Sequence, residues 1–251
     1  MRHALWLVLA GAVLLGSGVA VAGQPDSAPS GITVMLDVDF GPDVASGPGR
    51  PRGVRLDYHF LAGNPQTGER LPAIRDTRLR FHNGFRFNGP LFIQCSPGAA
   101  EPADCPSRSR VGSGDVLVDA RPAAAEPIRL RLLVYNTRPR RGNTRFLFFT
   151  QANGTVVSKL FAEVVTDPAG PYREALVLDL GPPDQQGFAI REINLRTLNK
   201  SVGTRVGARN VRRYLLEAPR GCRGSWRTAD AVDYANGESL VAADASPCDP
   251  K

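Results

Sequence analysis

Histidine, cysteine and long apolar runs are scarce in this chain of 251 residues, which has three histidines and four cysteines. Beyond residue 22, no stretch approaches the roughly 18 consecutive apolar residues of a membrane-spanning helix, so no transmembrane segment is predicted there. The cysteines form no C-x-x-C pair, and only His59 and His82 lie outside the first residues, which argues against a zinc site. We therefore predict neither a bound metal nor a cofactor.

The composition favours a folded chain that is rich in turns. The 26 glycines and 21 prolines exceed average usage without reaching low-complexity levels, and 42% of the residues are hydrophobic. That fraction is enough for a packed core, and the length suits one large all-β domain or two small ones. Only three of the 31 basic residues are lysine. This arginine bias, with abundant alanine, glycine and proline, is typical of a GC-rich genome and does not by itself indicate nucleic-acid binding.

Residues 1–22 have the pattern of a secretory signal peptide. Arg2 supplies a basic start, residues 4–15 form an uncharged apolar run, and small residues end in an A-x-A site at Ala22. A retained membrane anchor is the alternative, but the apolar run is short for a span and a polar linker follows it. We expect cleavage after Ala22, a mature chain that starts at Gly23, and a secreted, extracellular protein without a transmembrane segment.

The four cysteines predict two disulfides, because an exported chain meets an oxidising compartment. Four cysteines allow three pairings, and the sequence alone does not choose among them. We expect Cys95 to pair with Cys105, since they enclose a polar, proline-containing loop that buries little. We expect Cys222 to pair with Cys248, which would tie the end of the chain to the strand region near Trp226.

Alternation of apolar and polar residues with a period of two predicts strands along most of the chain. The pattern is clearest over 32–40, 54–60 and 128–134. Further strands are expected over 75–82, 91–95, 110–120, 145–151, 155–166, 174–180, 188–197, 211–217, 226–234 and 238–243. Asn153-Gly154 and Asn236-Gly237 predict hairpin turns. A single short helical turn is expected, within 201–210.

About a dozen short strands without alternating helices indicate an all-β fold, an antiparallel β-sandwich with two disulfides. A closed barrel-like sandwich is the alternative. No repeat of fixed period and no long linker interrupts the pattern. We therefore expect residues 23–30 to be a flexible arm and residues 31–251 to form a single domain.

Several segments spread over the expected mature chain carry a family resemblance. They are the runs 34–40, 78–81, 87–88 and 109–114, together with Cys95, Cys105-Pro106, Cys222, Ser225-Trp226, Tyr234, Gly237 and Cys248. In these features the chain resembles a family of uncharacterised secreted β-rich proteins from high-GC actinobacteria. The resemblance implies an exported β-rich fold, and it places no catalytic residue on any position of this sequence.

Candidate catalytic residues are few. Ser113 lies in the run 111–114, Val-Gly-Ser-Gly, which invites comparison with the nucleophile elbow of α/β-hydrolases. Val111 stands where that motif needs glycine, and no histidine follows in the chain, so we predict instead a bend or bulge at the two glycines. His59 and His82 alternate onto the polar sides of predicted strands and are expected at the surface.

Asp37 and Asp39 are two residues apart on one predicted strand, so they share a face. Paired carboxylates can ligate calcium or act as acid and base in a glycosidase-like reaction. No D-x-D-x-D-G loop accompanies this pair, however, and alternating acids on an exposed strand are ordinary and discourage edge-to-edge aggregation.

Basic residues are concentrated in two segments. Residues 129–145 hold six arginines and no acid, and residues 191–227 hold ten basic residues against two acids. If the two segments adjoin, they form a positive face for an anionic polymer, a lipid headgroup or phosphate, with Arg138, Arg140 and Arg141 as the candidate binding residues. A solvated arginine-rich surface is the plainer interpretation. Export and the lack of a known recognition module argue against nucleic acid.

The sequence as a whole indicates a secreted, non-enzymatic β-sandwich protein that binds an anionic polymer or lipid of the cell envelope through an arginine-rich face. Two alternatives stay open. One is a secreted carboxylate-based hydrolase that uses Asp37 and Asp39, and the other is an extracellular structural protein that assembles with itself through exposed strand edges. Trp226 and Tyr234 are expected in the core beside the terminal disulfide.

Overall fold

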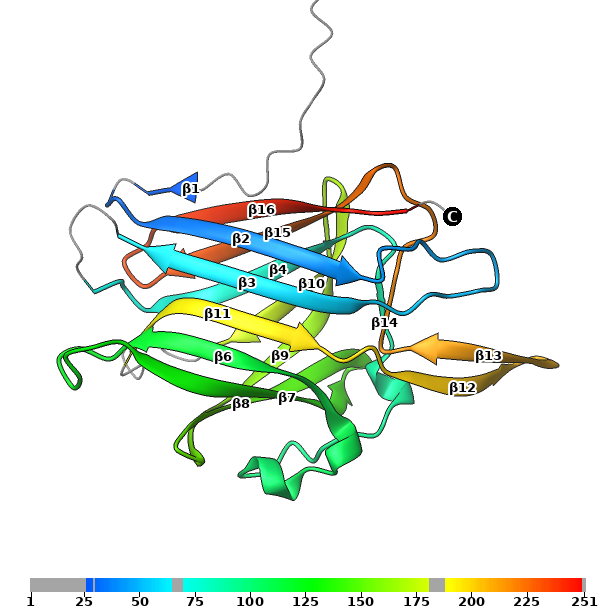
Figure 1. Cartoon of the computed structure of the whole chain (residues 1–251), viewed down its shortest axis with the longest axis horizontal. Coiled ribbons are helices and arrows are strands. Elements are labelled where there is room, and N and C mark those ends of the chain that lie inside the picture. The colour runs from blue at the N-terminus through cyan, green and yellow to red at the C-terminus, as the bar shows by residue number, and fades with distance from the viewer. Residues whose placement is uncertain (1–25, 29, 65–69, 181–187, 250–251) are drawn as a thin grey trace, which may run out of the picture.

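The structure is a computed structural model that describes residues 26–28, 30–64, 70–180 and 188–249 (Figure 1). The expected signal peptide, residues 1–22, lies outside these ranges. The strands are β1 (Asp26–Ser27), β2 (Thr33–Gly41), β3 (Arg55–Gly63), β4 (Ile74–His82), β5 (Arg86–Phe87), β6 (Arg110–Asp119), β7 (Ile128–Arg140), β8 (Asn143–Ala152), β9 (Thr155–Ala169), β10 (Tyr172–Asp179), β11 (Ala189–Thr197), β12 (Ser201–Val206), β13 (Arg209–Tyr214), β14 (Leu216–Glu217), β15 (Ser225–Tyr234) and β16 (Ser239–Pro247). Three short 3-10 helices are η1 (Gly89–Leu91), η2 (Pro102–Asp104) and η3 (Ser107–Ser109). The all-β prediction is confirmed.

Twelve strands form one continuous antiparallel sheet in the order β1-β2-β3-β11-β6-β7-β8-β9-β10-β4-β15-β16. The sheet curls until β16 lies beside β2 (Figure 1). The backbone N–H of Val38 donates to Asp244 Oδ2 at 2.7 Å, and Ser246 Oγ donates to the Val38 carbonyl, so side chains of β16 join the two edges. The expected two-sheet sandwich is thereby corrected to a nearly closed, barrel-like sheet. Alternation alone does not distinguish a sandwich from a barrel-like sheet, because both architectures bury every second residue of a strand.

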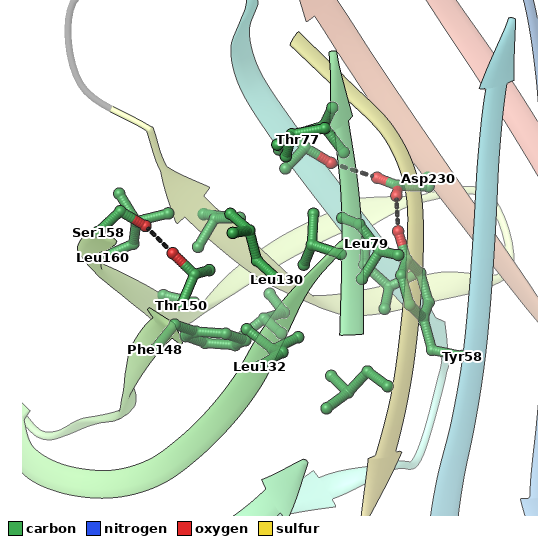
Figure 2. Close-up of a pocket in the computed structure, with 18 of the residues that line it drawn as sticks. Tyr58, Thr77, Leu79, Leu130, Leu132, Phe148, Thr150, Ser158, Leu160 and Asp230 are labelled. Atoms are coloured by element: carbon green, nitrogen blue, oxygen red, sulfur yellow. Dashed lines mark hydrogen bonds between the residues drawn. The ribbon is translucent and has the colours of Figure 1, made fainter. Parts of the chain in front are cut away.

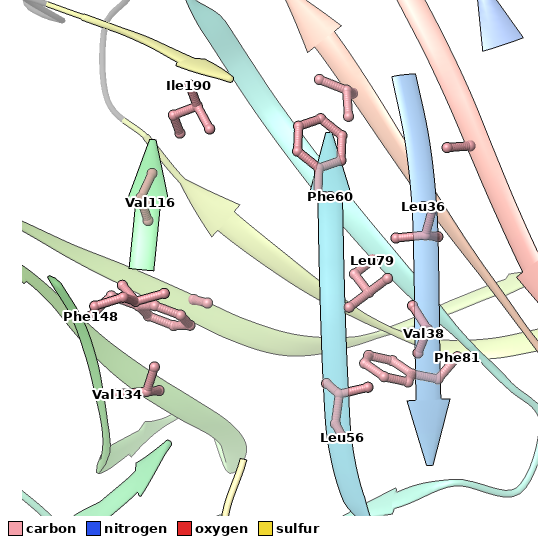
Figure 3. Close-up of a cluster of buried hydrophobic side chains, with 14 of the residues drawn as sticks. Leu36, Val38, Leu56, Phe60, Leu79, Phe81, Val116, Val134, Phe148 and Ile190 are labelled. Carbon is pink, nitrogen blue, oxygen red and sulfur yellow. The ribbon is translucent and has the colours of Figure 1, made fainter. Parts of the chain in front are cut away.

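The interior of the barrel-like sheet is filled by the inward-facing residues of the strands. Figure 3 shows Leu36 and Leu56 on one wall and Phe148 on the opposite wall, with their side chains directed into the shared interior. Trp226 is fully buried, and its ring lies edge-on to Phe40 and Phe85 at centroid distances of 5.9 and 5.4 Å. The predicted core position of Trp226 is confirmed, as is that of Tyr234.

A second, smaller core lies on the outer side of β7 and β8. It comprises Cys95, Ala99, Cys105, Leu133, Tyr135, Leu147 and Phe149. The loop that covers these strands is closed by the Cys95–Cys105 disulfide, which confirms that predicted pair. Its Cys95 N–H donates to the Asn136 carbonyl at 2.8 Å, and Thr137 Oγ1 donates to the Cys95 carbonyl at 2.8 Å. The disulfide therefore fixes a cover over an apolar strand surface.

The strand expected over 91–95 is wrong. Proline at the start of η1 favours a tight turn, and the side-chain amide of Asn136 donates to the carbonyls of Gly89 at 3.0 Å and Ile93 at 3.1 Å. These carbonyls are satisfied by a side chain, so the segment does not need a strand partner.

The helical turn expected within 201–210 is also wrong. The segment forms the hairpin β12–β13, which turns at Gly207 with a φ of +59° and projects from the end of the sheet (Figure 1). Positive φ at glycine carries no Cβ clash, and the valines of the segment favour extended backbone. Within the expected flexible arm, Asp26 and Ser27 pair with β2. The second predicted disulfide, Cys222–Cys248, is confirmed.

The predicted bulge near Ser113 is confirmed. The register of β6 against β7 shifts between Arg110 and Gly112. A Cβ atom added to Gly114 would lie 1.7 Å from the carbonyl oxygen of Asn194, so only glycine fits where β6 approaches β11 this closely. The two glycines of the motif therefore serve strand packing.

Candidate functional site

The barrel-like sheet encloses an apolar cavity of about 90 Å³ (Figure 2). Its walls come from nine strands, namely β3, β4, β6 to β11 and β15. Most of the side chains that line it are leucine, isoleucine or valine. On β7, Leu130 and Leu132 face the cavity because side chains two residues apart share a face of a strand. On β11 the inward positions are Ile190 and Ile193, because a bulge between residues 190 and 192 shifts the alternation by one residue.

One wall of the cavity carries a buried carboxyl group (Figure 2). Asp230 is 1% exposed, and its two oxygens accept hydrogen bonds from Tyr58 Oη and Thr77 Oγ1, each at 2.7 Å. Burial raises the pKa of Asp230, although the two hydrogen bonds oppose the shift. Burial and the neighbouring carboxyl group raise the pKa of Tyr58 well above its usual value. The three groups form a polar point in an otherwise apolar wall.

A second polar point lies on the opposite wall. Thr150 and Ser158 are directly paired across β8 and β9, and their hydroxyl oxygens are 2.7 Å apart. A hydroxyl can donate one hydrogen bond and accept two, so this pair keeps acceptor capacity toward the cavity. The arrangement combines apolar walls with few polar groups, which is typical of small-molecule sites.

A smaller cavity of about 40 Å³ adjoins the first one. Both cavities are lined by Leu56, Phe148, Leu176 and Leu195, so these four side chains separate the two spaces. The interior of the sheet therefore contains two neighbouring spaces that share part of one wall.

The sequence did not single out this cavity. The sequence did contain a signal for the inward direction of Asp230, which lies in an alternating strand. Every second residue of that strand is buried: Trp226, Thr228, Asp230, Val232 and Tyr234. The alternation of β15 therefore predicts an inward carboxyl group. The empty volume had no such signal, since it depends on how side chains from nine strands meet.

The predicted acidic pair lies on the outer face of β2. Asp37 and Asp39 are both exposed and share one face, as the alternation predicts. They line a surface groove of about 520 Å³ that also includes Asp57, which lies opposite Asp39 in the strand register. Asp57 accepts hydrogen bonds from Arg55 Nε at 2.9 Å and Arg196 Nε at 2.6 Å. The groove thus contains three carboxyl groups, one of them neutralised by two arginines.

The two histidines and Ser113 are distributed around these surfaces. His59 and Ser113 also line the groove, and His59 Nε2 lies 3.6 Å from Glu192 Oε1. His82 is half-buried on β4, and burial lowers its pKa, aided by the charge of Arg227. His82 does not line the groove, so the two histidines lie on different surfaces.

The predicted anion-binding arginines cluster at the turn between β7 and β8. Arg138, Arg140 and Arg141 are all exposed there. The hollow beside Arg140 is lined by charged residues of both signs: Arg75, Asp76, Arg78, Arg145 and Glu163. Other arginines of the two basic segments pair with acids, as Arg129 does with Asp115. The first basic segment is therefore partly neutralised by neighbouring strands.

Three further observations complete the description of the site. Among the residues that the structure covers, no group of three or more His, Cys, Asp or Glu side chains could hold a metal ion. In the same part of the chain, no helix is long and apolar enough to cross a membrane. Comparison with protein-family models, curated proteins and solved structures finds no match for this chain.

Proposed function

We propose that this chain is a non-catalytic binding protein that takes a slender aliphatic group into the cavity of its barrel-like sheet. The enclosed space of about 90 Å³ between apolar walls is the observation that carries the proposal. An engineered apolar cavity of about 150 Å³ stays dry and binds benzene, so the smaller space here suits an aliphatic group of fewer than about six non-hydrogen atoms. An aliphatic chain gains contact with the walls without displacing ordered water.

The polar points of the cavity restrict the ligand's chemistry. A neutral hydroxyl or amide at one end of an aliphatic chain can hydrogen-bond to the Asp230 carboxyl group or to the Thr150–Ser158 pair. A carboxylate ligand is disfavoured, because a second acidic group beside Asp230 would be buried without a cation. The ligand class is therefore an alcohol, ester or amide with a narrow hydrocarbon chain.

The extracellular setting belongs to the same proposal. Two disulfides support it, because such bonds persist in oxidising compartments. The resemblance to secreted actinobacterial proteins and the expected cleavage after Ala22 agree with it. Binding to an anionic polymer or lipid of the envelope, through Arg138, Arg140 and Arg141, would bring the protein to a source of aliphatic ligands.

The second candidate is a secreted carboxylate-based hydrolase. The groove lined by Asp37, Asp39 and Asp57 favours it, because convergent carboxyl groups in a hollow are what acid–base catalysis requires. Hydrolysis of polysaccharides that is lost in Asp39→Asn would establish this function instead. We prefer the binding function because two arginines hold Asp57, as in an ordinary surface ion-pair network.

Calorimetric titration of the purified, oxidised protein with butan-1-ol tests the binding function. The matched variants are Ala162→Leu, which fills the cavity, and Ala231→Leu, which adds the same carbons at a half-buried position that does not line the cavity. We expect saturable binding to the natural protein and to Ala231→Leu, and binding weakened by about tenfold or more in Ala162→Leu. Absence of saturable binding to the natural protein contradicts the proposal.

A further inference from the structure

A hollow of about 210 Å³ lies where the loop around residues 46–51 meets β13 and β14. Three arginines line it: Arg86 from β5, Arg213 from β13, and Arg220, which follows β14. The only acidic residue in its wall is Glu217. The hollow shares no lining residue with the apolar cavity. Val206 and Val211 of the projecting hairpin β12–β13 also line the hollow.

The single acid of this hollow is already neutralised. Glu217 is 3% exposed, and its Oε1 accepts the backbone N–H of Tyr214 at 3.1 Å and lies 3.1 Å from Arg213 Nε. Neither Arg86 nor Arg220 belongs to an ion pair among the described residues. Two exposed guanidinium groups therefore face the hollow with their charge available to a ligand.

More distant charges leave this balance unchanged. Burial raises the pKa of the Glu174 carboxyl group, and the positive charge of Arg86, which lowers that pKa, has the smaller effect. Glu174 is not part of the wall of the hollow. The hollow itself therefore carries an excess of positive charge.

The backbone around the hollow is held in place before any ligand binds. The Ser46 N–H donates to the Pro219 carbonyl at 2.9 Å, and Ser46 Oγ donates to the Ala218 carbonyl at 2.8 Å. The Cys222–Cys248 disulfide lies two residues after Arg220 and restrains the same segment. Preorganisation of this kind lowers the entropic cost of ordering a site on binding.

Glycines provide the room for a ligand. Gly47, Gly49 and Gly84 line the hollow, and the last two have positive φ values of +66° and +102°. A side chain at Gly49 or Gly84 would be strained in that conformation, and a Cβ atom at Gly84 would lie 3.1 Å from the Pro219 side chain. Part of the wall of this basic hollow is therefore glycine backbone.

We propose that this hollow binds a phosphate group, either as free phosphate or as part of a larger molecule. Guanidinium groups bind phosphate through paired N–H donors, and Arg86 and Arg220 supply them from two sides while Arg213 adds charge. The site is independent of the aliphatic cavity, and it differs from the arginines at the turn between β7 and β8.

Two double variants of equal charge change test the proposal. Arg86→Gln with Arg220→Gln alters the hollow, whereas Arg108→Gln with Arg173→Gln removes two exposed arginines that line neither the hollow nor the turn between β7 and β8. Calorimetric titration with inorganic phosphate should give a dissociation constant that rises by about tenfold or more in the first variant and by less than about threefold in the second. Thermal unfolding of both variants verifies that they are folded, since all four side chains are exposed.

A vesicle arm of the experiment distinguishes the source of the phosphate group. Sedimentation is measured with phosphatidylcholine vesicles, with and without phosphatidic acid. Binding that requires phosphatidic acid and is lost in the first variant assigns the hollow to a lipid headgroup, and binding of inorganic phosphate alone assigns it to a free phosphate. Failure of the natural protein to bind either probe, or an equal loss in both double variants, would overturn the proposal.

Discussion

Replacement of a small side chain in the cavity wall by a larger one tests whether the cavity is empty space or packed interior. Ala162 on β9 is 1% exposed and its side chain contributes to the cavity wall. Leucine at this position adds three carbons to a space of about 90 Å³. The change Ala162→Leu should therefore increase the stability of the free protein and at the same time weaken the binding of an aliphatic ligand.

Two routes give the same magnitude for the gain in stability. Burial of three carbons at about 0.8 kcal/mol each contributes about 2.4 kcal/mol. Removal of a 90 Å³ cavity at about 24 cal/mol per Å³ contributes about 2.2 kcal/mol. Loss of rotamer freedom by leucine offsets about 0.5–1 kcal/mol. We expect a net increase of about 1.2–1.9 kcal/mol in the free energy of unfolding, which raises Tm by about 2–8 °C.

Urea unfolding followed by tryptophan fluorescence measures this change, because Trp226 is fully buried. Ala231→Leu is the control, since its added carbons stay outside the cavity, and we expect a change within about 0.5 kcal/mol. Destabilisation of Ala162→Leu relative to this control would refute the reasoning, because it would mean that the space is not available. Undiminished butan-1-ol binding by a stabilised Ala162→Leu variant would refute the location of the site.

Three further predictions concern stability. Replacement of Cys95 and Cys105 by alanine should lower the free energy of unfolding by about 2–3 kcal/mol in guanidinium titrations, and an unchanged midpoint would contradict the role of the disulfide as a fixed cover. Burial raises the pKa of Asp230, so the native state retains its proton over a pH range in which the unfolded chain has lost it, and stability falls as pH rises through that range. Asp230→Asn should flatten this part of the pH profile of the unfolding free energy, and parallel profiles would count against it. Gly114→Ala should destabilise the protein by about 2–3 kcal/mol or more, because the added Cβ atom would meet a backbone carbonyl. Gly203 has open space around it, so Gly203→Ala should change stability by less than about 0.5 kcal/mol in the same assay. Equal effects of the two substitutions would contradict this account.

Local pattern predicted most strands. The alternation over residues 32–40 matches β2 to within a residue, and Asn153-Gly154 forms its turn with positive φ at both residues. These features depend on residues that are close together in the sequence, so the sequence alone predicts them. Of the two wrong segments, only residues 91–95 depended on a distant group. Asn136 satisfies the carbonyls after β5, and the hairpin β12–β13 takes the place of the expected turn.

The closure of the sheet and the cavity could not be predicted in the same way. Closure depends on contacts such as the one between Val38 and Asp244, which are more than 200 residues apart. The acidic face of β2 was predicted from Asp37 and Asp39, but Asp57 joins it only through strand register. An enclosed volume has still less local basis, since it arises wherever side chains from many strands fail to meet.

Methyl NMR during titration with butan-1-ol tests the central claim most directly. Leu132 faces the cavity, whereas its neighbour Leu133 is equally buried in the outer core and serves as an internal control. We predict saturable shift changes at Leu132 and at further cavity leucines such as Leu130, Leu160 and Leu178, with no change at Leu133 or Leu147. Shift changes confined to exposed methyl groups such as those of Met35 and Val241, or equal changes at Leu132 and Leu133, would contradict binding inside the sheet.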